Sequence, residues 1–137
     1  MRILIADADE TFLENFQAYI WDCGYDAEIT TSGLQCQAIL DRCIPDVIVI
    51  ERELLRSDQQ GVLAKLQSRP ELASIPIVVL VADSHEAWED ITDSRIVAWL
   101  EKPIQLRDSW HQIQCALGRP RTPQSANSRE RVRGLLQ

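Results

Sequence analysis

Short apolar runs alternate with amphipathic segments along most of the chain. The clearest run, residues 46–51, places Val-Ile-Val-Ile between Asp46 and Glu51. β-Branched side chains favour the pleated backbone, and a strand that is apolar on both faces is typical of a parallel sheet covered by helices on both sides. Comparable runs predict four more strands, over residues 2–6, 25–30, 75–81 and 96–100.

The segments between the strands repeat apolar residues at helical spacing. Asp9 and Ser32 precede two of these segments and are predicted N-caps, because their side-chain oxygens can accept free N–H groups of a first helical turn. Residues 52–60 are polar apart from two leucines and predict a loop. We expect helices over about residues 10–23, 33–43, 61–67, 84–91 and 106–117.

The resulting order is strand then helix, five times over. This order predicts an α/β fold with one parallel sheet, right-handed crossovers and helices on both faces. Residues 1–118 are expected to form a single domain. Residues 119–137 hold Pro, Ser, Asn, Gln and Arg with few apolar side chains, and they predict a flexible basic tail.

Charge divides the chain into two unlike parts. The whole chain has a net charge of −7, while residues 119–137 carry five Arg and one Glu, which leaves −11 on residues 1–118. Such an acidic body argues against nucleic-acid binding by the domain. Apolar runs are far shorter than the roughly 20 residues of a membrane span, and the N-terminus does not resemble a signal peptide, so we expect a cytoplasmic protein.

The cysteines and histidines predict no site of their own. A Ser-His-Asp set, a phosphate-cradling glycine loop and zinc-type spacing are all missing from the sequence. His85 and His111 stand alone near predicted helix ends and are expected to be solvated. Each cysteine falls in an apolar helical pattern, so buried free thiols are expected at Cys23, Cys36, Cys43 and Cys115.

Charged residues follow three of the predicted strands. Asp7 and Asp9 come after the first strand, Glu51 ends the third, and Lys102 follows the fifth. Because chemistry in open α/β sheets sits at the carboxyl ends of the strands, we expect these side chains to share one pocket. Clustered carboxylates repel one another unless a cation balances them, and either Lys102 or Mg²⁺ fits that role. The simpler alternative is that Glu51 is only a solvated acid at a strand end.

Four segments in this order resemble those of response-regulator receiver domains of two-component signalling: residues 3–10, 45–51, 75–82 and 100–103. The resemblance extends to about residue 118. It implies a flavodoxin-like, three-layer fold with a five-stranded parallel sheet in the order 2-1-3-4-5 and five helices. It also implies that Glu51 occupies the phospho-acceptor position, that Lys102 contacts the phosphoryl group, and that the Lys102–Pro103 bond is cis.

Three positions depart from the pattern of receivers that accept phosphate. Glu51 stands where they carry Asp, Ala8 stands at the place of a metal-ligating acid, and Val81 replaces the Thr or Ser that ends the fourth strand. The extra methylene moves the carboxylate of Glu51 by roughly 1.5 Å, and a misplacement of about 1 Å can cost around a hundredfold in rate. Ala8 removes a direct ligand, so a Mg²⁺ site would rest weakly on Asp7, Asp9 and Glu51.

We therefore predict a pseudo-receiver, a non-enzymatic signalling module without a cofactor. Glu51 is expected to make a charge-assisted hydrogen bond to Lys102 and so to imitate a phosphorylated Asp. The alternative is a working, Mg²⁺-dependent receiver that takes a phosphoryl group on Glu51 or Asp9. A third alternative, a nucleotide or flavin binder, lacks a phosphate loop after the first strand.

Three tryptophans fall in segments that dock partners in the receiver family. Trp88, Trp99 and Trp110 lie on the predicted fourth helix, fifth strand and fifth helix. Trp99 stands at or near the family's aromatic switch residue, and Val81 is the other switch-equivalent position. Tryptophan is enriched at interface centres, so we expect a protein partner or a homodimer to bind here. Core filling is the alternative, and the apolar stripe around Trp110 favours it for that residue.

Overall fold

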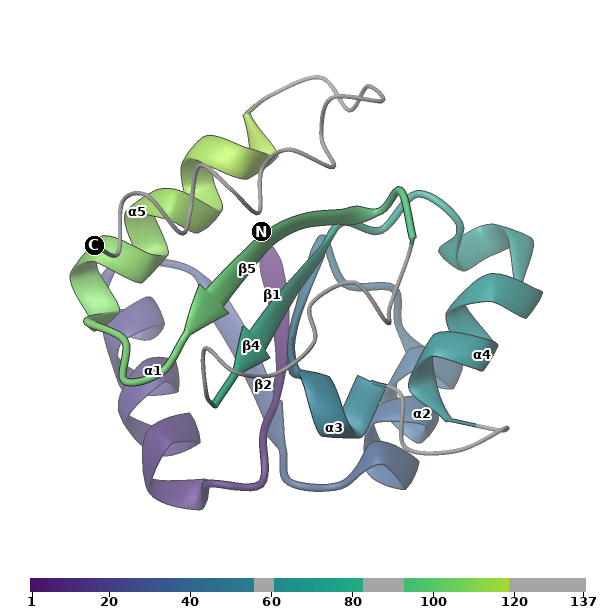
Figure 1. The fold of residues 1–137 in the computed structure, drawn as a ribbon, viewed down its shortest axis with the longest axis horizontal. Helices are drawn as coiled ribbons and strands as arrows, with labels where there is room; N and C mark the ends of the chain where they lie inside the picture. The colour runs from purple at the N-terminus through teal and green to yellow at the C-terminus, as the bar shows by residue number, and fades with distance from the viewer. Residues whose placement is uncertain (56–60, 83–92, 119–137) are drawn as a thin grey trace.

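The structure is a computed structural model that describes residues 1–55, 61–82 and 93–118. Five strands form one parallel sheet in the expected order β2-β1-β3-β4-β5 (Figure 1). They are β1 (Arg2–Ala6), β2 (Asp26–Thr30), β3 (Val47–Glu51), β4 (Ile77–Val81) and β5 (Ile96–Glu101). β1 and β3 are interior strands, and β5 is an edge strand that β3 and β4 separate from β1. The side chain of Lys102, which follows β5, must therefore extend toward the centre of the sheet to reach the acids after β1.

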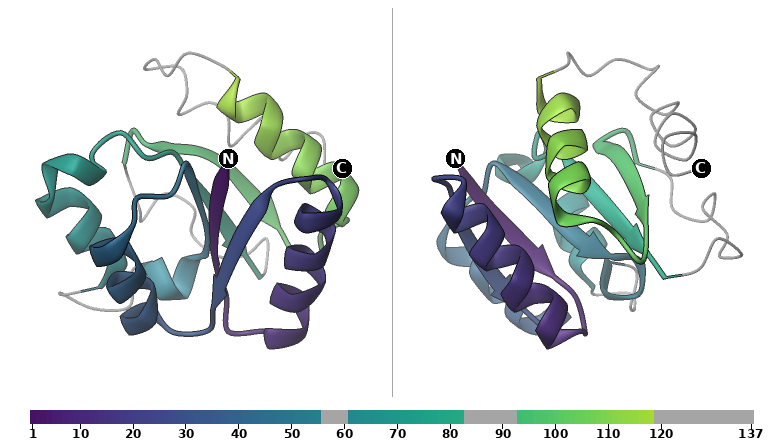
Figure 2. Two further views of the ribbon diagram at one scale, coloured as in Figure 1. Left: turned by 180° about the vertical axis from the view of Figure 1, so that it is seen from behind. Right: turned by 90° about the vertical axis from the view of Figure 1, so that its left-hand side faces the viewer.

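Helices cover both faces of this sheet. α1 (Glu10–Asp22) and α5 (Leu106–Leu117) lie on one face, while α2 (Gly33–Arg42) and α4 (Val62–Ser68) lie on the other (Figure 1; Figure 2). α4 is the third helix expected from the sequence, and the expected helix over residues 84–91 lies outside the described residues. Within the described part of the chain, no helix is both long and apolar enough to cross a bilayer.

Two connections are short helical turns, α3 (Arg52–Leu55) and the 3-10 helix η1 (Pro70–Leu72). The loop predicted over residues 52–60 is therefore wrong at its start. Leu55 is fully buried in the core beneath α3. Burying one leucine stabilises a structure by roughly 1.5–3 kcal/mol. Burial of Leu55 therefore explains why a helical turn forms in a segment whose polar residues predict a loop.

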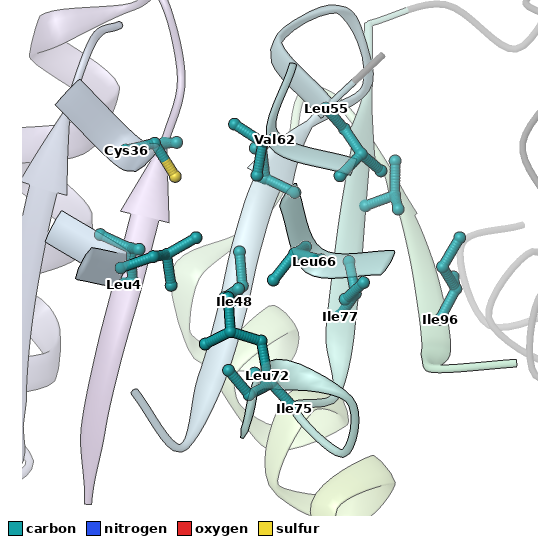
Figure 3. Close-up of a cluster of buried hydrophobic side chains, with 14 of the residues drawn as sticks. Leu4, Cys36, Ile48, Leu55, Val62, Leu66, Leu72, Ile75, Ile77 and Ile96 are labelled. Atoms are coloured by element: carbon teal, nitrogen blue, oxygen red, sulfur yellow. The ribbon is translucent and has the colours of Figure 1, made fainter. Parts of the chain in front are cut away.

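The sheet divides the apolar core into two layers. Ile48 and Ile50 of β3 pack with α2 and α4, whereas Val47 and Val49 pack with α1 and α5. All four side chains are fully buried, which explains why this strand is apolar on both faces until it ends at Glu51. Figure 3 shows the first layer, where side chains from α2, α3 and α4 meet those of the strands.

Local signals set the helix ends where the sequence predicts them. The carboxylate of Asp9 accepts the N–H of Phe12 at 3.1 Å, and the hydroxyl of Ser32 accepts the N–H of Gln35 at 3.3 Å. Both predicted N-caps are confirmed. After α1, Gly24 has a φ of +92°, a left-handed conformation that side-chain-bearing residues rarely adopt.

The cysteines are free thiols in unlike environments. Cys36 is buried, and burial raises the pKa of its thiol to about 12. Cys43 is half-buried, but Cys23 and Cys115 are exposed, so the prediction of buried thiols is wrong for these two. Cys23 occupies the C-cap of α1, and Cys115 lies on the outer side of α5, where helical spacing turns it away from the core.

Candidate functional site

Asp7 is the most deeply buried charged group at the carboxyl edge of the sheet. It directly follows β1 and is 0% exposed. Its N–H donates to the carbonyl of Thr30 at 3.1 Å, and its Oδ1 accepts the N–H of Asp9 at 2.8 Å. Because an isolated carboxylate is costly to remove from water, Asp7 needs a positive partner.

Lys102 supplies that positive charge. Its Nζ lies 2.5 Å from Oδ2 of Asp7 and 4.9 Å from the ring centre of Phe12. Among the described residues, this ammonium pairs with Asp7 and not with Glu51, so the predicted hydrogen bond between Glu51 and Lys102 is wrong. The physical reason is desolvation, since a fully buried carboxylate gains more from a cation than a partly solvated one.

Phe12 is the site residue that the sequence pattern missed. Its spacing predicts only a core position, but its ring also lies beneath the ammonium of Lys102, where a cation–π contact forms. The sequence feature that could have identified Phe12 as a site residue is its position in the first turn of α1, three residues after the N-cap Asp9.

Glu51 ends β3 and is half-buried. Its Oε1 accepts the N–H of Ala8 at 3.1 Å, which ties the acid to the backbone that follows β1. Burial raises the pKa of Glu51 above its ordinary value; the Ala8 N–H lowers it, the charge of Asp7 raises it, and the ammonium of Lys102 lowers it. Glu51 is therefore partly withdrawn from water and held beside the segment that follows β1, and it is not simply a solvated acid.

The acids, as arranged, do not suit magnesium. Among the residues that the structure describes, no group of three or more His, Cys, Asp or Glu side chains could hold a metal ion. Asp9 caps α1, Asp7 is paired with Lys102, and Ala8 has no side-chain oxygen. Mg²⁺ favours near-octahedral oxygen ligands at about 2.0–2.1 Å, and these residues do not converge to provide them.

Val81 and Lys102 connect the ends of β4 and β5. The carbonyl of Val81 accepts the N–H of Lys102 at 2.8 Å, and the Lys102–Pro103 peptide bond is cis, as the resemblance implies. The side chain of Val81 is fully buried in the same core cluster as Trp99. Val81 therefore contributes methyl groups at a position where a hydroxyl could have donated a hydrogen bond.

Two of the three tryptophans expected on a partner face lie inside the protein. Trp99 is 5% exposed, and Trp110 is 4% exposed and packs against Tyr25 with ring centres 5.4 Å apart. Core filling is confirmed for Trp110, and burial argues against direct partner contact by Trp99. Trp88 lies outside the described residues. Conversely, Trp21 is exposed at the end of α1.

The strand order and the helices on both faces match the flavodoxin-like fold of receiver domains. No family model matches the chain. Its sequence is 29% identical over 129 residues to the response regulator MprA of Mycobacterium leprae. It is 27% identical over 135 residues to the DNA-binding dual master transcriptional regulator RpaA of Synechocystis.

These matches cover 93% and 94% of this chain but only 56% and 54% of MprA and RpaA. The chain thus spans about half the length of the curated relatives it matches. Among solved structures, the receiver domain of the sensor histidine kinase PA1611 of Pseudomonas aeruginosa, with a magnesium ion coordinated in its active-site cleft, is similar at a TM-score of 0.72. That match covers 86% of this chain and 98% of the other at 18% identity, so it shows the fold alone.

Proposed function

We propose that this domain is a receiver-type signalling module that acts through protein–protein contacts without being phosphorylated and without catalysing a reaction. One observation carries the proposal: both carboxylates of the site are already engaged by other groups of the chain, although Oδ2 of Asp7 has an ion pair and no hydrogen bond. Asp7 is held by the N–H of Asp9 and by Lys102, and Glu51 is held by the N–H of Ala8. Phosphoryl transfer depends on cations placed on the incoming phosphoryl group and on a free attacking oxygen.

The chemistry of the changed positions supports the same conclusion. Glu51 extends its oxygens roughly 1.5 Å beyond those of an Asp, which is enough to displace an attacking atom. Ala8 supplies no oxygen for a metal ion, and the metal would otherwise neutralise developing charge on the phosphoryl group. Val81 cannot donate a hydrogen bond that senses such a group. We therefore propose that the domain holds one signalling state.

Protein partners fit this function better than a small-molecule substrate. The relatives of this chain are named as regulators, and receiver domains transmit signals by contact with other proteins. We propose a protein of a two-component pathway, or a second copy of the chain, as the partner. Trp88 remains the proposed contact residue. Trp99 and Trp110 are buried, so they would contribute by packing in the core and not by touching the partner.

Incubation with acetyl phosphate and Mg²⁺, followed by intact-mass measurement, tests the proposal. We expect no phosphoryl adduct on the unmodified chain. The matched variant carries Ala8→Asp, Glu51→Asp and Val81→Thr, which restore an acid pair, a shorter acceptor and a hydroxyl. That triple variant is expected to gain an adduct that depends on Mg²⁺.

A stoichiometric adduct on the unmodified chain would instead favour a working receiver. Peptide mapping would then separate Glu51 from Asp9 as the acceptor. Loss of the adduct in Glu51→Gln, with retention in Asp9→Asn, would assign it to Glu51.

A further inference from the structure

Two side chains of the kind that bind metals lie together on the outer face of α5. His111 and Cys115 are four residues apart, so they occupy neighbouring turns of one helix face, and both are exposed. The Sγ atom of Cys115 lies 3.6 Å from Nε2 of His111. His111 is thus solvated as expected, but it does not stand alone.

That separation is the one that a tetrahedral zinc ion requires of two ligands. With Zn–S at about 2.3 Å and Zn–N at about 2.0–2.1 Å, a tetrahedral angle places the two ligand atoms about 3.6 Å apart. Thiolate and neutral imidazole are also the ligands that zinc favours. Without metal, the same distance suits a hydrogen bond between thiol and imidazole, so the pair is already oriented.

We propose that His111 and Cys115 form half of a Zn²⁺ site and that a second copy of the chain completes it. In the described part of the chain, no third His, Cys, Asp or Glu joins this pair to hold a metal. Structural zinc takes four ligands, and Cys₂His₂ is a common set. A two-fold axis through the ion brings the same pair from the α5 of the second copy, and one ion then joins two chains.

Binding of Zn²⁺ by these four ligands is balanced in charge and in protons. Each Cys115 releases its thiol proton to solvent and binds as a thiolate, and each His111 binds through Nε2 as a neutral imidazole. Two thiolates neutralise the ion, so the centre carries no net charge. The net charge of −7 on each chain favours the approach of the cation but opposes association of two chains without it.

Sedimentation of the reduced 137-residue chain, with and without added Zn²⁺, tests the proposal. We expect a monomer in the presence of chelator and a dimer holding one zinc per two chains after the addition. Co²⁺ used in place of Zn²⁺ should give the visible bands of a tetrahedral ion together with a thiolate-to-cobalt charge-transfer band. Adding chelator should return the monomer.

Three variants make the test specific. His111→Ala and Cys115→Ser should each weaken zinc-dependent dimerisation by at least about a hundredfold, because each removes two of the four ligands from the dimer. Cys23→Ser, which removes an exposed thiol from α1, should dimerise as the parent does. All three side chains are exposed, so circular dichroism should show unchanged folding.

A zinc complex of one ion per chain that stays monomeric would overturn the proposal, as would a dimer that persists in Cys115→Ser. Failure of the parent chain to bind Zn²⁺ or Co²⁺ would overturn it as well. The outcome is independent of phosphorylation, because neither residue contacts the acidic edge of the sheet in any interaction that the structure shows.

Discussion

Asp7 and Glu51 are carboxylates at the ends of neighbouring strands, but their environments give them different roles. Asp7 is fully buried and holds Lys102 as its counter-ion. Glu51 is half-buried, binds a backbone N–H, and has a pKa raised chiefly by burial. Both residues could be chosen from the sequence because they end apolar strands, whereas their partners depend on how far each side chain is removed from water.

Replacing Lys102 by Met keeps an apolar stem beside Phe12 and removes the charge. Asp7 is then buried without a counter-ion, and we expect the free energy of unfolding to fall by about 2–3 kcal/mol, less than for a fully buried pair because the Lys102 side chain is 20% exposed. Urea denaturation measures the loss. The double variant Asp7→Asn with Lys102→Met should recover most of it, and a double variant as unstable as the single one would contradict the pairing.

The substitution Glu51→Gln should change how stability depends on pH. A raised pKa means that ionisation of Glu51 opposes folding, so stability is highest below its ordinary value of 4.5 and falls as pH rises through the raised pKa. The amide side chain of the variant would keep an oxygen for the Ala8 N–H but cannot ionise. Thermal melting at several pH values should show equal stability of variant and parent near pH 4 and a more stable variant at about pH 7. A less stable variant at neutral pH would contradict this assignment.

At the scale of elements, Arg95 links the start of β5 to α4 and η1, which lie earlier in the chain. It precedes β5, and its Nη1 donates to the carbonyl of Leu66 in α4 at 2.7 Å and to that of Leu72 in η1 at 3.2 Å. It also forms an ion pair with Asp93 at 2.7 Å. Arg95 thus donates to two carbonyls at helix ends, and that of Leu72 also accepts the N–H of Ile75 at 3.3 Å.

Replacing Arg95 by Met should lower the free energy of unfolding by about 2–3 kcal/mol, because the carbonyl of Leu66 loses the guanidinium donor and the Asp93 carboxylate loses its counter-ion. The matched control is Arg42→Met. Arg42 pairs with Glu28 at 2.6 Å, but its side chain is 63% exposed, so its loss should cost less than about 1 kcal/mol. Chemical denaturation of both variants measures the difference, and equal losses would contradict the role of Arg95.

At the scale of the whole molecule, the two core layers define how far the folded domain extends along the described chain. Both layers are filled by side chains from residues 3–113, and α5 ends at Leu117. The sequence predicts a boundary near residue 118, because the apolar pattern stops there and the composition becomes basic and polar.

A chain ending at Gly118 is therefore expected to fold as the full chain does. Since the removed residues carry little apolar surface to bury, the Tm should change by less than about 2 °C. Circular dichroism melting of both chains measures this. A drop of several degrees would show that residues 119–137 contribute to the folded domain.

The sequence by itself determined the order of the five strands along the chain, the strand that forms the centre of the core, the two N-caps and the residues placed at the carboxyl edge. These features follow from the spacing of apolar residues and from short-range hydrogen bonding, which are local properties. Only the tertiary structure decided that Lys102 pairs with Asp7 and that Trp99 is buried. Those outcomes depend on burial and on separations of a few ångströms between side chains, which spacing along the chain does not specify.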